Sequence, residues 1–495
     1  MAIDTTTSSN APVREPLDNP RLSTRDKLVL FVLCAAQFMV ALDFSVLNVA
    51  LPELGTDLGM SRSALQWAVT AFALPSGGFL LLFGRTGDLY GRRKFFLTGL
   101  ALFGAASLLA TLAWDPASFL TGRALQGLGA AAIVPTGMSL LTTTFPEGPA
   151  RDRALGISGT LLSLGFTVGM VAGGVLTDAL GWRSTMGLLT VFALIVLPLA
   201  PGLLPRSAPH GHGGAAGTPA PERPRLDVPG AVTVTAGLLS LIYALSTAAD
   251  HGFGHTGVIV ALAAGLLLLT AFTVVESRSA APLVSLPMLR RRTVAWGNLG
   301  GLVTFSTMST VVFVLTLYLQ EILHLSAFET GLVFGVQGVL SAVAGTCAPR
   351  VIGRFGARRT LVGSLTGQGA LIAALLLLNA HTWSVWVATA AVCLAGVCHL
   401  GAIISYGLTV TSGVPDGEQG LATGLVTSTQ QVGITVGIPL LGVLATTSDD
   451  LLSGVHTVLA LDAAALLTAA VLVGLGLRVR RTVSGVVEAE PVGPR

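Results

Sequence analysis

The chain has 495 residues, of which 52% are hydrophobic and only 11% are charged, and its formal net charge is +3. Soluble domains carry about one quarter charged residues, so a soluble protein of this composition would expose large apolar patches and aggregate. The small net charge and the scattered basic residues also exclude nucleic acid as an expected partner.

Long apolar runs predict about fourteen membrane-spanning helices. A bilayer core of about 30 Å needs roughly 20 apolar residues in helical form. The first run follows a polar tail and is too long for a signal-peptide core, so we expect it to remain as a span. The predicted spans are 28–51, 65–84, 95–113, 118–141, 154–177, 184–204, 228–247, 256–275, 297–320, 330–349, 359–379, 384–407, 419–445 and 456–477.

The basic residues predict which side of the membrane each connection faces, because cytoplasmic segments carry an excess of Lys and Arg. If the N-terminus lies in the cytoplasm, the predicted spans place almost all of the 28 basic residues in cytoplasmic segments. The exceptions are Arg62, Arg123 and Arg183. The sequence therefore predicts a multi-pass protein of the cell membrane, with both termini cytoplasmic.

Two similar loops indicate an internal repeat. The segment 84–93 (GRTGDLYGRR) joins the second and third spans, and 353–359 (GRFGARR) joins the tenth and eleventh. A weak repeat at corresponding loops is typical of transporters built from two related halves. The predicted organisation is a cytoplasmic tail 1–27, a six-helix half 28–204, a cytoplasmic Pro/Gly-rich linker 205–227, two inserted transmembrane helices 228–275, a cytoplasmic loop 276–296, a six-helix half 297–477 and a cytoplasmic tail 478–495.

Asp43 is an acidic residue within the first predicted span. A carboxylate at mid-membrane costs about 3 kcal/mol on insertion scales, so it normally faces a bundle interior or an aqueous cavity. There it can exchange a proton or contact a substrate; the alternative is a static partner for Arg123. Asn48, further along the same span, is a candidate for lining a cavity.

The loop 84–93 combines glycines, one acid and arginines within a tight turn. Glycines allow close backbone approach and positive φ. The acid can face a helix N-terminus or an arginine, in a contact that forms in one conformational state and breaks in the other. We therefore predict a conformational latch made of Gly84, Asp88, Gly91, Arg92 and Arg93. The alternative is an ordinary set of cytoplasmic basic residues.

Arg123 lies early in the fourth span, and Gln126 follows one turn later on the same face. A buried guanidinium can tune a nearby carboxylate or relay charge. The alternative is an arginine that extends to the outer interface. We group both residues with Asp43 as candidates for proton coupling or substrate binding.

The fifth span carries a regular series of glycines, Gly165, Gly169, Gly173 and Gly174. Their spacing leaves one helix face without side chains and predicts close packing against another helix. Spacing alone predicts nothing more specific than packing.

Further polar residues lie within the later spans. His399 either lines a cavity or bonds a backbone carbonyl, and Gln430 and Gln431 are candidates for cavity hydrogen bonds. Asp462 lies six residues into the last predicted span, so we place it at the outer interface. No cluster of cysteine, histidine and acidic residues has metal-ligand spacing, and neither lysine belongs to a phosphate-binding loop, so we expect no metal and no cofactor.

These motifs resemble those of the major facilitator superfamily, in particular its fourteen-helix branch of drug:proton antiporters, over roughly 25–480. The loop 84–93 is similar to the superfamily's signature loop, which implies Asp88 and Arg92 in the latch. The segment 42–52 is similar to the first-helix motif of that branch, which implies proton or cation coupling at Asp43. Residues 123–129 are similar to the fourth-helix motif, which implies a proton-transfer role for Arg123.

Two positions depart from the family pattern. Gly165 to Gly174 resembles the antiporter motif of the fifth helix, but Met170 stands where the family has proline. Gln430 stands where a thirteenth-helix segment usually has arginine. The resemblance still implies an all-α integral membrane protein with the major facilitator fold: two six-helix halves plus two inserted helices.

The leading hypothesis is a secondary active transporter that exports a small amphipathic drug or antibiotic by alternating access, driven by the proton gradient (drug:proton antiport). Its partners would be a small-molecule substrate, protons and the lipid bilayer, without an obligate protein partner. The alternatives are a proton-coupled uptake permease or a dedicated metabolite exporter. A membrane receptor or enzyme is less well supported, because the chain offers no large soluble domain and no convergent catalytic cluster.

Overall fold

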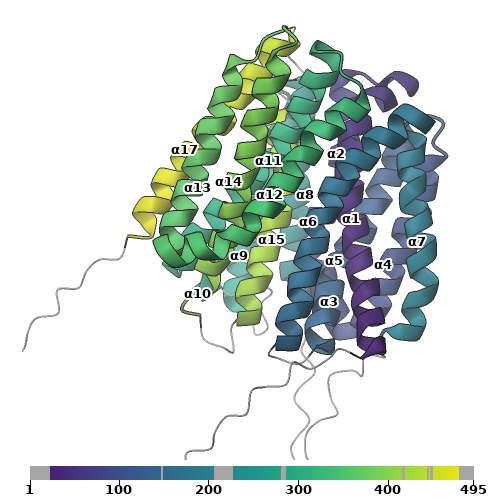
Figure 1. The fold of residues 1–495 in the computed structure, drawn as a ribbon. Helices are drawn as coiled ribbons and strands as arrows, with labels where there is room; N and C mark the ends of the chain where they lie inside the picture. Colours follow the sequence, from purple (N-terminus) through teal and green to yellow (C-terminus); the bar gives the residue numbers. More distant parts are fainter. Residues whose placement is uncertain are drawn as a thin grey trace, which may run out of the picture.

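The computed structural model describes residues 23–145, 149–205, 227–252, 254–279, 286–414, 419–442, 445 and 450–478, and every regular element in these ranges is a helix (Figure 1). Most of the predicted tails and of the linker 205–227 lies outside them. The helices are α1 (Thr24–Asp57), α2 (Arg62–Gly78), α3 (Leu80–Tyr90), α4 (Arg92–Thr111), α5 (Pro116–Thr144), α6 (Pro149–Leu180), α7 (Arg183–Leu203), α8 (Val228–His251), α9 (Thr256–Arg278), α10 (Leu286–Leu289), α11 (Arg292–Leu317), η1 (Tyr318–Ile322), α12 (Ala327–Phe355), α13 (Ala357–Ala374), η2 (Leu375–Leu377), α14 (Ser384–Thr411), α15 (Gln419–Gly437), η4 (Ile438–Gly442) and α17 (Leu451–Gly476).

Helices occupy all fourteen predicted spans. Within the described ranges, eleven are long and apolar enough to cross a bilayer, and the bent pair α2–α3 makes twelve. The other two predicted spans correspond to α8 and α15. α8 contains a shorter apolar stretch, Val228–Ala244, so the total of fourteen is reached only if α8 and α15 also cross the membrane. The all-α integral membrane class predicted from the sequence is confirmed.

Side chains at the helix starts explain several of the observed bounds. Ser23 and Asp26 form a reciprocal capping box at α1, and Ser326 and Glu329 form another at α12. At α5, Asp115 caps the helix together with Ser118. Such caps satisfy backbone N–H groups that have no partner within the first helical turn.

Glycines end two helices at corresponding places of the predicted repeat. Gly91 separates α3 from α4 with φ of 116°, and Gly356 separates α12 from α13 with φ of 80°. A side chain with a Cβ atom is disfavoured at positive φ, so glycine at these two positions lets each pair of helices meet in a tight turn.

The predicted span 65–84 is not one straight helix. α2 and α3 meet at Phe79 with a bend of 44°. Pro75 lies one turn before the bend, where its ring removes a backbone donor and crowds the preceding turn. The second span therefore consists of two helical segments.

The helices form two bundles that lie side by side (Figure 1). In the first, α1 packs on α5, α6 and α7, and α4 packs on α5 and α7. In the second, α11 packs on α14, α15 and α17, and α13 packs on α14 and α17. The bundles meet where α6 packs on α12 and α2 on α15, while α8 and α9 pack on each other and α8 also contacts α2.

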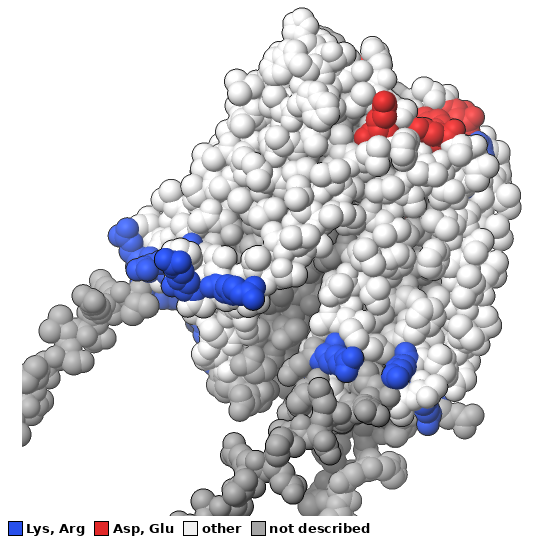
Figure 2. All heavy atoms as spheres, viewed as in Figure 1, with Lys and Arg blue, Asp and Glu red and all other residues white. Residues whose placement is uncertain are grey.

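Figure 2 shows basic residues gathered toward one end of the molecule and acidic residues toward the other, with an uncharged belt between them. We call the end where α3 meets α4 the basic end, and the end where α1 finishes at Asp57 the acidic end. Large apolar side chains are exposed in the belt, such as Leu194 at 67% and Leu267 at 70%. This distribution suits hydrocarbon around the belt and water at both ends.

The glycines of α6 bring this helix against its neighbours almost backbone to backbone. A Cβ atom on Gly165, Gly169 or Gly173 would lie 2.9–3.0 Å from a carbonyl oxygen of α1, closer than side chains normally approach. Gly174 faces α12 instead, where a Cβ atom would lie 2.6 Å from the carbonyl oxygen of Ala327. The predicted bare face is thus the seam between α6 and α1, and α6 continues through Met170 without an assigned break.

We predict that Gly169→Ala lowers the free energy of unfolding by about 1–3 kcal/mol, because the added methyl group meets the Leu42 carbonyl oxygen and forces α1 and α6 apart. Gly156→Ala on the same helix is the matched control, since nothing lies within 4 Å of its added Cβ atom. There alanine should stabilise the helix by up to about 1 kcal/mol. Thermal unfolding of the purified proteins in detergent measures both; equal stability of the two variants would contradict the packing argument.

Candidate functional site

Asp43 of α1 and Arg123 of α5 form an ion pair inside the first bundle. Arg123 Nη1 lies 2.6 Å from Asp43 Oδ1, and both side chains are fully buried. Pairing opposite charges offsets part of the large free-energy cost of removing each one from water. The alternative that Arg123 extends to the outer interface is therefore wrong.

Two further helices, α2 directly and α4 through Gln126, fix the orientation of the arginine. Arg123 Nε donates to the carbonyl oxygen of Ala68 in α2 at 3.1 Å, and the guanidinium carbon lies 4.6 Å from the centre of the Phe72 ring. Arg123 Nη1 also donates to Gln126 Oε1 at 2.8 Å, and Gln126 Nε2 donates to Ser107 Oγ of α4 at 2.8 Å. The structure therefore brings together the three predicted coupling residues, and it adds Ser107, which the sequence analysis did not identify.

The pair leaves some of its hydrogen-bonding capacity unused. Asp43 Oδ2 and Arg123 Nη2 are buried and have no hydrogen-bond partner among the described residues. A single bond between the charged groups, rather than a two-bond fork, holds them together. A proton on the carboxylate would remove the negative charge that holds Arg123 Nη1. The arrangement can therefore convert proton binding into release of an arginine.

The loop predicted to be a latch packs within the first bundle. Asp88 Oδ1 accepts from Arg92 Nε at 2.5 Å and from Ser139 Oγ of α5 at 3.1 Å. Gly84 and Gly87 allow α3 to approach α5, because a Cβ atom on either would meet the side chain of Pro135 or Thr136.

The other end of the loop is also anchored. Arg93 donates to the carbonyl oxygen of Pro201 near the end of α7, and Gly91 supplies the turn with positive φ. Asp88, Arg92 and Arg93 thus connect α3, α4, α5 and α7. In the state described, these bonds stay inside one bundle.

A second polar cluster lies in the second bundle, and only its histidine was identified from the sequence. Thr304 Oγ1 of α11 donates to Gln368 Oε1 of α13 at 2.6 Å and lies 2.9 Å from His399 Nδ1 of α14. Gln368 Nε2 donates to Thr307 Oγ1 at 3.4 Å, and the Phe305 ring packs edge-on against the imidazole at 5.2 Å. His399 thus bonds a threonine hydroxyl rather than a backbone carbonyl.

The remaining predicted cavity residues do not join either cluster. Asn48 is buried in α1 and its Nδ2 donates to the carbonyl oxygen of Phe44 at 2.7 Å, within its own helix. Gln430 and Gln431 are half-buried on α15, a helix that packs on α11 and α14. In the described part of the chain, no group of three or more His, Cys, Asp or Glu side chains is placed to hold a metal ion. The clusters offer hydrogen bonds and one ion pair.

The expectation for Asp462 is wrong. It lies near the middle of α17, which begins at Leu451 rather than near 456, and its side chain is fully buried. Neither carboxyl oxygen has a hydrogen-bond partner among the residues whose placement is described. Among the residues that the structure describes, two aspartates are fully buried, Asp43 with an ion-pair partner and Asp462 without one.

Substitution by leucine should change the free energy of unfolding in opposite directions at Asp43 and Asp462. Asp43→Leu leaves Arg123 buried without its counter-charge and should lower the free energy of unfolding by about 3–5 kcal/mol. Asp462→Leu replaces an unbonded polar group with an apolar one and should raise it by about 1–3 kcal/mol. Unfolding in detergent gives both values. A loss of stability at both positions would mean that Asp462 has a partner we have not identified.

Comparison with curated proteins identifies relatives along most of the chain. A cephamycin export protein of Amycolatopsis lactamdurans is 38% identical over 424 residues, which cover 83% of each chain. A puromycin resistance protein of Streptomyces alboniger is 38% identical over 423 residues, 84% of this chain and 81% of that one. A probable actinorhodin transporter of Streptomyces coelicolor is 33% identical over 429 residues, 84% of this chain and 72% of that one.

Solved structures share this fold at lower sequence identity. A crystal structure of the POT family transporter PepTSo aligns with a TM-score of 0.67 at 16% identity, covering 90% of this chain and 97% of that one. The sequence also matches the family description Major Facilitator Superfamily over residues 33–304 and 297–494. The predicted major facilitator fold is therefore confirmed, and the chain belongs to the Major Facilitator Superfamily.

Proposed function

We propose that the chain is a proton-coupled transporter that exports a small amphipathic drug or antibiotic. The observation that carries this proposal is the buried Asp43–Arg123 pair, a titratable group inside the first bundle with one carboxyl oxygen unbonded. Two relatives that align with more than four fifths of this chain are named for export of cephamycin and for resistance to puromycin. These names support outward transport and an antibiotic-like substrate.

Proton binding and the position of Arg123 are coupled in this proposal. While Asp43 is charged, it holds Arg123 Nη1, and Arg123 in turn bonds the Ala68 carbonyl of α2 and Gln126 of α5. A proton on Asp43 weakens the ion pair, so Arg123 and its bonds to α2 can rearrange. Substrate leaves in the protonated state, and loss of the proton re-forms the pair. No cofactor takes part, since the proton gradient supplies the free energy.

Contacts between the bundles support alternating access. At the acidic end, Asp178 Oδ2 of α6 accepts from the backbone N–H of Phe328 in α12 at 3.0 Å. Gln320 Nε2 of η1 donates to the Val49 carbonyl of α1 at 2.9 Å. These bonds hold the bundles together at that end, and transport would require them to break while contacts form at the basic end.

The two bundles would be the halves that move, 28–204 and 297–477, with 228–275 as an inserted pair. The basic end would face the cytoplasm, as the positive-inside rule expects, in the cell membrane of a bacterium. In this scheme Asp88, Arg92 and Arg93 hold the loop in one state and release it in the other. The protein needs a substrate, protons and a bilayer, and no obligate protein partner.

A dedicated exporter is the second candidate. Three relatives are named for cephamycin, puromycin and actinorhodin, one compound each, which would suit a narrow substrate range, whereas another, from Mycobacterium tuberculosis, is named a multidrug resistance protein. Comparison of several substrates in one assay separates the two.

The first test is proton-driven accumulation of ethidium and of puromycin in inside-out membrane vesicles, with and without a protonophore. Asp43→Asn should abolish accumulation in response to the proton gradient, because the residue can no longer lose and regain a proton. Asp57→Asn on the same helix is the matched control, since Asp57 pairs with Arg183 at the exposed acidic end. Full uphill export by Asp43→Asn would refute the coupling role. Transport of puromycin without ethidium would indicate a dedicated exporter.

A separate prediction concerns the latch. Asp88→Asn weakens the bonds to Arg92 and Ser139 but leaves the buried network intact. If the latch stabilises one state by roughly 1 kcal/mol, the maximal rate should fall by about fivefold while substrate affinity stays unchanged. Vesicle transport over a range of substrate concentrations gives both quantities. A large loss of affinity at a normal maximal rate would contradict a latch.

A further inference from the structure

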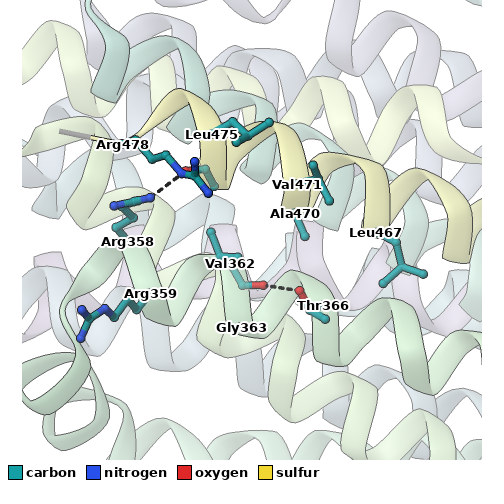
Figure 3. A pocket seen from close by; sticks show the side chains of 11 residues that line it. Arg358, Arg359, Val362, Gly363, Thr366, Leu467, Ala470, Val471, Leu475 and Arg478 are labelled. Atoms are coloured by element: carbon teal, nitrogen blue, oxygen red, sulfur yellow. Dashed lines mark hydrogen bonds between the residues drawn. The ribbon is translucent and has the colours of Figure 1, made fainter. Parts of the chain in front are cut away.

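An open groove lies between α13 and α17, away from both polar clusters. It has a volume of about 780 Å³, and its apolar walls include Val362, Leu467, Val471 and Leu475 (Figure 3). Val471 is 60% exposed and Leu475 is 49% exposed, so the groove opens onto the apolar belt of the second bundle rather than into its interior. In the membrane, hydrocarbon chains would face this surface.

Three arginines lie at one end of the groove (Figure 3). Arg358 Nη2 donates to the Gly474 carbonyl at 2.8 Å, which fixes the guanidinium at the end of α17. Arg359 and Arg478 are exposed, and no ion pair with a described acidic residue is formed by any of the three. No Asp or Glu lines the groove. The end of the groove therefore carries a concentrated positive charge without a counter-charge from the described chain.

The depth of these arginines matches that of lipid head groups. They lie at the basic end, where α12 turns into α13 at Gly356, next to the apolar belt. A guanidinium donates paired hydrogen bonds to phosphate oxygens, and basic residues at this level attract anionic lipids. A ligand that fits both parts of the groove has a phosphate group on hydrocarbon chains.

We propose that the groove between α13 and α17 binds one anionic phospholipid, with its phosphate against Arg358, Arg359 and Arg478 and an acyl chain along the apolar walls. The lipid would join the basic ends of α13 and α17, where Arg358 already donates a hydrogen bond across to Gly474. This binding site does not depend on the proposed substrate or on proton coupling, so it can fail while the transport proposal stands.

The test uses the purified full-length protein in a neutral detergent, with bound lipid counted by native mass spectrometry and stability followed by thermal unfolding. Phosphatidylglycerol, phosphatidylcholine with the same acyl chains, and inorganic phosphate are titrated separately. We expect one retained phosphatidylglycerol per chain and a rise in unfolding temperature with that lipid alone. Equal effects of the two lipids would refute a charge-selective site, and displacement of the lipid by inorganic phosphate would indicate a site for the free anion.

Two variants separate the two parts of the groove. Arg359→Gln should weaken binding about fivefold by removing one charge, while Arg350→Gln, an exposed arginine on α12 outside the groove, is the matched control. Gly363→Phe places a ring in the groove from a position where nothing lies within 4 Å of the added Cβ atom, and it should weaken lipid binding; Gly353→Phe, whose added Cβ atom also meets nothing within 4 Å, is its control. Equal losses in Arg359→Gln and Arg350→Gln would show a diffuse basic surface and overturn the proposal.

Discussion

The structure depends most on one interaction, the ion pair between Asp43 and Arg123 inside the first bundle. Asp43 and Arg123 come from helices far apart in the sequence, and each alone would be strongly destabilising in the bundle interior. Their pairing fixes the rotation of α1 relative to α5, and the bond from Arg123 to the Ala68 carbonyl extends that constraint to α2. The same pair is the feature on which proton coupling is proposed. Stability and the proposed proton coupling would therefore depend on the same pair, and a proton at Asp43 would weaken the contacts that join α1, α2 and α5.

The two bundles use different polar chemistry at their centres. The first contains a salt bridge, while the second contains a threonine, a glutamine and a histidine joined by uncharged hydrogen bonds. Related halves with unequal polar groups can respond differently to the same proton gradient. The contacts between the bundles at the acidic end provide the structural features through which a change in the first bundle would reach the second.

Much of the helical architecture could be predicted from the sequence, because the length and apolar character of the runs set the helices. Asp43 and Arg123 stood out as charges in apolar runs. A pairing with Arg123 was one of two interpretations of Asp43, but the sequence could not decide between them, since helices that are apolar on all sides give no signal for their rotation. Thr304 and Gln368 were missed because uncharged polar residues are unremarkable within a span. Asp462 was misplaced because the last helix begins several residues earlier than the hydropathy indicated.

The seam between α1 and α6 has a consequence at the level of the gene. At Gly165, Gly169 and Gly173 the carbonyl oxygens of α1 occupy the space where a side chain would begin. Every single-base change in the first two positions of a glycine codon introduces a side chain or a stop. Only the third base can change freely at these positions. We therefore expect homologous genes to vary here mainly by synonymous substitution, while the lipid-facing positions of the same helix exchange one apolar residue for another.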